Sequence, residues 1–181
     1  MNATFRTLVR TAVFTAFSVI AAAALAQATG FGSAGWKQGV ESYWPNRATT
    51  HYLQSAQTYA AEFQAHVARA GQPAPAVVQE VHKTLTGYLD EANKHLATMK
   101  KDFAEDKEAV AAVEAIEKDL AKAVSDHKAM IACCQNEKFD KAMAMTCCTD
   151  LSKSIGKVHA SHVALMGKLA AKYPPQPAAK K

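Results

Sequence analysis

Four long stretches of this chain carry apolar residues at intervals of three and four positions, the repeat of an amphipathic α-helix. We predict helices over about 49–70, 75–100, 103–134 and 141–173. Short connectors make helices that follow one another in sequence antiparallel. The pattern therefore predicts an all-α fold, an antiparallel up-down-up-down four-helix bundle.

The connectors follow from residues that end or begin helices. The segment 71–75 contains Gly and two Pro, which end the first helix and begin the second. The next break depends on charge: Lys100 and Lys101 suit a helix end, and Asp102 with Glu105 resembles a capping box. The alternative is one very long helix over both segments. In that case the histidines would not lie at the common heights along the bundle that are described below.

The N-terminal residues 1–26 have the pattern of a cleaved signal peptide. Arg6 and Arg10 precede an apolar run over 11–25, which ends at a small-residue cleavage site. This run is too short for a comfortable transmembrane helix, so we expect no stable membrane span after cleavage. The pattern predicts a periplasmic or secreted protein.

Two segments flank the predicted bundle, which we place at 48–173. Residues 27–47 are rich in glycine and aromatic side chains and lack a helical period, so we predict a lead-in that packs onto the bundle. Residues 174–181 form a tail of Pro, Ala and Lys that we expect to be disordered.

Charge and motifs exclude several function classes. Removing Arg6 and Arg10 from 21 basic residues leaves 19 against 16 acidic ones, a mature charge of +3. The lysines are dispersed among acids along the helices, so we expect no nucleic-acid partner. The sequence has no nucleophile elbow, P-loop or dinucleotide fingerprint, which favours a binding role over an enzyme.

The histidines are the main candidates for chemistry. His82, His127 and His162 each replace an apolar residue within a stripe. Counting from the turns at 1.5 Å per residue places His66, His82, His127 and Cys148 within about 6 Å of one level, one from each helix. Imidazole and thiolate ligands that converge in a bundle suit Cu or Zn, and Met130 would favour copper.

A second level lies roughly 18 Å lower and holds His51, His95, His159 and His162, with His51 directed away from the seam. His95 and His162 leave b-type haem ligation open, whereas the absence of C-x-x-C-H excludes covalent c-type haem. The alternative for every histidine is a neutral, half-buried ring that is hydrogen-bonded within the core.

The cysteines form two vicinal pairs on either side of the third connector. In a secreted chain, Cys133, Cys134, Cys147 and Cys148 indicate disulfides. An antiparallel hairpin would pair Cys133 with Cys148 or Cys134 with Cys147. The rival is a thiol cluster for a soft metal such as Cu(I), assisted by Met130, Met143 and Met145.

Together these patterns predict a periplasmic or secreted bundle that binds Cu or Zn through inward histidines, with possible cysteine ligands, in metal handling or sensing. A structural or partner-binding bundle without metal, held by disulfides, is the alternative. A b-type haem protein for electron transfer is the third reading. The alanine-rich stripes also leave a homodimer or a protein partner open.

Overall fold

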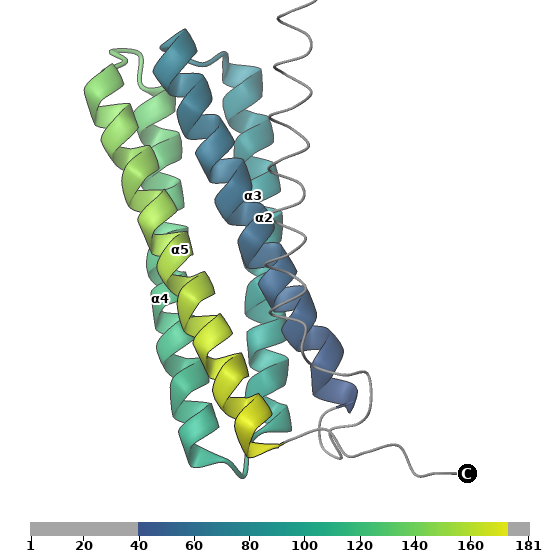
Figure 1. Cartoon of the computed structure of the whole chain (residues 1–181). Coiled ribbons are helices and arrows are strands. Elements are labelled where there is room, and N and C mark those ends of the chain that lie inside the picture. The colour runs from purple at the N-terminus through teal and green to yellow at the C-terminus, as the bar shows by residue number, and fades with distance from the viewer. Residues whose placement is uncertain (1–39, 174–181) are drawn as a thin grey trace, which may run out of the picture. The chain divides into compact units, whose positions relative to one another are not determined.

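The computed structural model of the chain describes residues 40–173, with side chains from Asn46 onward. This part consists of four helices without a strand: α2 (Val40–Ala70), α3 (Pro75–Asp102), α4 (Lys107–Gln135) and α5 (Lys141–Lys172) (Figure 1). The predicted all-α fold is confirmed. The signal peptide and the tail lie outside the described residues, as do residues 27–39 of the lead-in.

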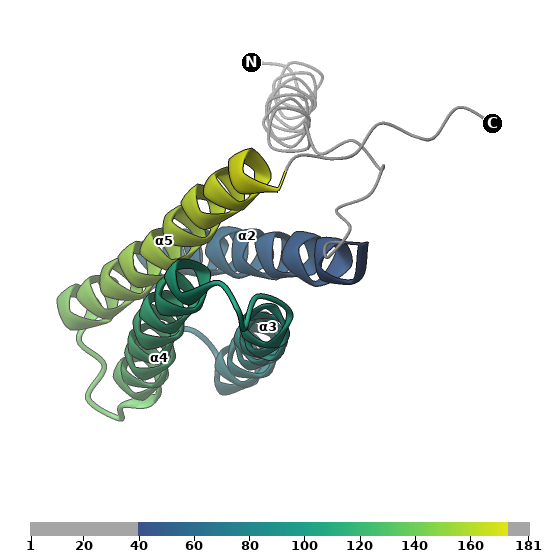
Figure 2. The same ribbon diagram turned by 90° about the horizontal axis from the view of Figure 1, so that it is seen from below.

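The four helices form an up-down-up-down bundle. Helices α2 and α4 each pack against both α3 and α5. The α2–α3 and α4–α5 connectors lie together at the upper end, and the α3–α4 connector lies at the lower end (Figure 1). Figure 2 shows the four helices from below. No helix in the described part is long and apolar enough to cross a membrane.

The core is built from the predicted apolar stripes, with one exchange in α3. Val78 and Leu85 are fully buried and seven residues apart, so either position 81 or position 82 can face the core between them. The structure buries Val81 and leaves His82 exposed, contrary to the predicted seam position of His82. Burying the apolar side chain avoids the desolvation of an imidazole.

Helix α2 begins at Val40, well before the predicted start near residue 49. The end of the predicted lead-in is therefore helical. In this first part the buried side chains include Asn46 and Thr49, which are 2 % and 0 % exposed. Polar residues at core positions leave no apolar period, which explains why the pattern missed the start of the helix.

The break between α3 and α4 is confirmed, but its cap lies further along the chain. Helix α3 ends at Asp102, and Phe103 is buried in the turn that follows. The N-cap of α4 is Asp106, whose carboxylate accepts a hydrogen bond from the backbone N–H of Ala109 at 3.2 Å. The turn is thus longer than the predicted capping box at Asp102.

The same carboxylate ties the lower end of α5 to α4. Asp106 accepts hydrogen bonds from Lys172 Nζ at 2.7 Å and from the Tyr173 hydroxyl at 3.0 Å. The contact with Lys172, followed by the Ala109 amide, lowers the pKa of Asp106 to about 2. The lower end of the bundle is therefore closed by a carboxylate that stays ionised in mild acid.

Candidate metal site

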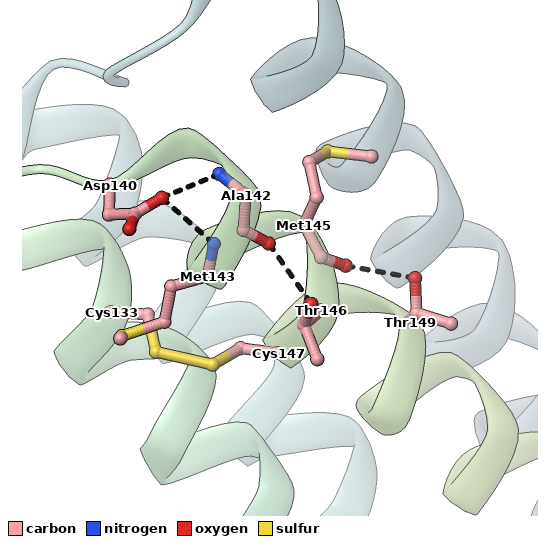
Figure 3. The surroundings of a disulfide bond; sticks show 8 residues. All are labelled: Cys133, Asp140, Ala142, Met143, Met145, Thr146, Cys147 and Thr149. Atoms are coloured by element: carbon pink, nitrogen blue, oxygen red, sulfur yellow. Dashed lines mark hydrogen bonds between the residues drawn. A yellow bond between two sulfur atoms is a disulfide. The ribbon is translucent and has the colours of Figure 1, made fainter.

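The upper end of the bundle holds all four cysteines, where α4 ends and α5 begins. A disulfide joins Cys133 to Cys147, with Cα atoms 6.9 Å apart (Figure 3). Asp140 caps α5, because its carboxylate accepts hydrogen bonds from the backbone N–H groups of Ala142 at 2.8 Å and Met143 at 3.1 Å. This cap fixes where α5 begins and which of its residues face α4.

The observed disulfide differs from both predicted pairings. Neighbouring residues in a helix point about 100° apart, so each vicinal pair has one cysteine on the core stripe and one beside it. Cys134 and Cys148 are 2 % and 1 % exposed, whereas Cys133 and Cys147 are half-buried. The two cysteines at the edge of the core therefore form the disulfide, and the two core cysteines face each other, an arrangement that the two predicted pairings did not include.

The two core cysteines form a buried pair of thiols from facing helices. Cys134 and Cys148 are both outside the disulfide, and their side chains are close enough for each thiol to affect the pKa of the other. This contact, together with burial, raises the pKa of the Cys148 thiol. At neutral pH the pair therefore retains at least one proton, which a bound metal ion would have to displace.

Of the three methionines predicted to assist a soft metal, one shares the core with these thiols. Met130 is fully buried and lies four residues before Cys134 on the stripe of α4. Met143 is 56 % exposed, and the side chain of Met145 extends away from the disulfide in Figure 3. Of these three methionines, Met130 alone lies on the same buried stripe as Cys134.

Two of the predicted upper-level histidines lie together between α3 and α4. The rings of His82 and His127 have centroids 5.1 Å apart, with an interplanar angle of 38°. His127 is 2 % exposed, whereas His82 is exposed. Burial, followed by the charges of His82 and Lys128, lowers the pKa of His127 to about 4.

The other two predicted ligands of this level lie apart from the pair. His66 is half-buried and stacks on Phe63, with ring centroids 6.4 Å apart. Cys148 faces Cys134, which is seven residues, or about 10 Å along α4, from His127. Within residues 46–173 no three His, Cys, Asp or Glu side chains gather as a metal site.

The register of α4 against α5 explains this separation. Asp126 accepts a hydrogen bond from Ser154, so the neighbouring His127 is level with that part of α5 and not with Cys148. The midpoint of the hairpin therefore lies near the Asp140 cap instead of the middle of the connector. Counting from the connector misplaced the predicted ligands by several residues.

In the predicted lower group, His162 is the buried member. It is 0 % exposed, and its Nδ1 lies 3.3 Å from the hydroxyl of Thr50, which also donates a hydrogen bond to the backbone oxygen of Asn46. Burial, and less strongly His159, lowers the pKa of His162 to about 4. Sequence reasoning missed Thr50 and Asn46, because polar residues at core positions break the apolar period.

The remaining lower histidines do not converge on His162 as a set of ligands. His95 stacks on Tyr52, with centroids 5.8 Å apart and an interplanar angle of 12°. His51 is exposed, and its ring centroid lies 5.9 Å from that of the same tyrosine. Among the described rings, no contact joins His95 to His162, the pair named above as an example for b-type haem ligation.

Comparisons with known proteins add no identity to this geometry. No family model matches the chain, and searches of curated proteins and of solved structures also return no match. The function must therefore be argued from the two side-chain pairs themselves, the thiols of Cys134 and Cys148 and the imidazoles of His82 and His127.

Proposed function

We propose that this protein binds Cu(I) through Cys134 and Cys148 and serves in metal handling. The observation that carries the proposal is a pair of reduced, fully buried cysteines that face each other across α4 and α5. Thiolates are soft ligands that favour Cu(I), Zn and iron–sulfur clusters. Met130 on the same core stripe adds a soft thioether one turn away.

The number of available ligands favours Cu(I) over Zn. A structural zinc site takes four ligands, and a catalytic one takes three from the protein. Two thiols without a third gathered ligand fall short of either arrangement in the described part of the chain. Burial also keeps solvent away from the thiols, which protects a bound Cu(I) ion from exchange with water.

The proposed setting is periplasmic or secreted. The signal-peptide pattern of residues 1–26 supports this setting. The disulfide between Cys133 and Cys147 agrees with it, because such bonds persist in oxidising compartments. In such a compartment, deep burial would slow the oxidation of Cys134 and Cys148.

The test is a Cu(I) titration of the mature protein, anaerobic and free of any histidine tag, in competition with a chromogenic chelator. We expect one Cu(I) per chain and release of thiol protons on binding. Cys134→Ala with Cys148→Ala should abolish binding, whereas the matched control, Cys133→Ala with Cys147→Ala, should retain it. Binding that survives in the first double variant would overturn the proposal.

The alternative is a structural or partner-binding bundle without metal. The specific observation in its favour is the bond between Cys133 and Cys147, which links two helices whatever the remaining cysteines do. If the wild-type protein takes up no Cu(I) while its two remaining thiols react with a thiol reagent after unfolding, this alternative becomes the working function.

A further inference from the structure

We propose that His82 and His127 form a second metal site, for a divalent ion such as Cu²⁺, at the interface of α3 and α4. The proposal does not depend on Cu(I) binding by the thiols. It rests on two imidazoles from facing helices whose ring centroids are 5.1 Å apart. Imidazole is a borderline ligand that suits Cu²⁺, Zn²⁺ and Ni²⁺.

The two rings have different surroundings, as an accessible metal site requires. His127 is 2 % exposed and held in place by the packed core of the bundle. His82 is exposed, so its side chain can change rotamer to complete the site. One ligand is therefore preorganised and the other gives the ion a route from solvent.

The buried ring also has an unused nitrogen. Nε2 of His127 is buried and has no hydrogen-bond partner among the described residues. An unpaired buried polar atom is unfavourable, so such atoms in native proteins call for a partner. The adjacent Asp126 does not contact this nitrogen, and its carboxylate instead accepts hydrogen bonds from Lys122 at 2.6 Å and from Ser154.

The protonation state of the buried ring suits coordination. A metal ligand must be a neutral imidazole. Because burial lowers the pKa of His127 to about 4, this ring is neutral at physiological pH and no proton has to leave it. Its fixed position in the packed core makes His127 the anchoring ligand of the pair.

This site is separate from the thiol pair. His127 precedes Cys134 by seven residues on the same stripe, or about 10 Å along the helix, which is too far for one ion to bridge. Two protein ligands leave the other coordination positions of a divalent ion open to solvent. We infer an exchangeable site, which another metal-binding molecule can load or unload.

The experiment is a Cu²⁺ titration of the full mature chain that carries Cys134→Ala and Cys148→Ala, so that thiols neither bind nor reduce the ion. Electron paramagnetic resonance should show coordination by two imidazole nitrogens. Loss of even an outer-shell partner lowers metal affinity about 10- to 100-fold, so His82→Ala should lower Cu²⁺ affinity at least about tenfold. Because His82 is exposed, this variant should fold normally.

The matched control is His66→Ala, which removes a half-buried histidine that stacks on Phe63 and has no ring contact with another histidine among the described residues. It should leave the Cu²⁺ affinity and the spectrum unchanged. Equal affinity in His82→Ala and the parent chain, or a spectrum with a single imidazole nitrogen in the parent, would overturn the proposal. Since the thiols are absent here, either result leaves the Cu(I) proposal to its own titration.

Discussion

At the upper end of the bundle a disulfide joins α4 to α5, whereas at the lower end the same two helices are joined through Asp106, Lys172 and Tyr173. The first link is covalent and responds to reductants, and the second is ionic and responds to acid. Each half also has a buried histidine: His127 lies in the half of α4 that leads to the disulfide, and His162 lies in the half of α5 that leads to Lys172. The comparison teaches that a reductant acts on the upper link alone, whereas acid acts on the lower link and on a buried histidine in each half of the bundle.

Acid should have the largest effect on the stability of the bundle, because both buried histidines resist protonation in the folded state. Their pKa values fall from 6.5 to about 4 on folding, so the unfolded chain binds more protons between these values. Stability is therefore full above pH 6.5 and lost as the pH falls toward 4. At about 1.36 kcal/mol per pKa unit, each histidine accounts for about 3 kcal/mol of that loss.

Urea unfolding at pH 7, 5.5 and 4.5 measures this loss. His127→Leu and His162→Leu should each remove a large and similar share of the acid sensitivity, and the double variant most of it, because burial also lowers the pKa of His159. A parent chain equally stable at pH 7 and pH 4.5 would contradict the prediction. Unequal effects of the two single variants would show which end controls acid unfolding.

Removal of the covalent link should have the next largest effect. The disulfide closes a loop with a sequence separation of 14, and a loop of this size contributes about 3 kcal/mol by restricting the unfolded chain. Cys133→Ser with Cys147→Ser should lower the free energy of unfolding by about that amount at pH 7. If a reductant lowers the stability of this variant as much as that of the parent, the disulfide between Cys133 and Cys147 is not the source of the stabilisation.

A smaller loss is expected at the lower end. Asp106→Ala removes the cap of α4 and the partner of Lys172, and it should lower the melting temperature by about 4 °C. Because the pKa of Asp106 is lowered to about 2, its contribution is present above pH 4 and is lost as the pH falls through 2. Calorimetry should show the full penalty at pH 7 and a much smaller one at pH 2.

The smallest effect on stability is expected from replacing an exposed histidine, in contrast to the buried ones. His82→Ala changes an exposed side chain and should alter the free energy of unfolding by less than about 0.5 kcal/mol in metal-free buffer. Chemical denaturation with a chelator present measures it. A loss well above 1 kcal/mol would mean that His82 packs against His127 as part of the core.

The sequence predicted the bundle well because the apolar period reports directly on burial. Ile116, Leu120 and Ile155 lie where their stripes placed them, each 2 % exposed or less. Periodicity is weaker where two adjacent residues compete for one core position, as Val81 and His82 do. At such a position the cost of desolvating an imidazole determines which of the two side chains is buried, and the spacing of apolar residues does not include that cost.

The candidate sites were harder to predict, because ligands meet only if the helix register is right. One cap, Asp140, sets the register of α5 against α4, and the sequence offers several polar residues nearby that could take this role. The cysteines were placed at the correct hairpin but paired wrongly by one residue. Histidines on different helices depend on two or more such registers, and their errors accumulate.

The disulfide also determines how the chain behaves when it is cut. The connector at 136–140 lies inside the ring that Cys133 and Cys147 close, and the other two connectors lie outside it. A protease that cleaves this connector leaves α5 covalently attached to α4. The nicked protein would migrate as one species on a non-reducing gel and as two fragments once the bond is reduced, so damage at this exposed turn does not by itself release a helix.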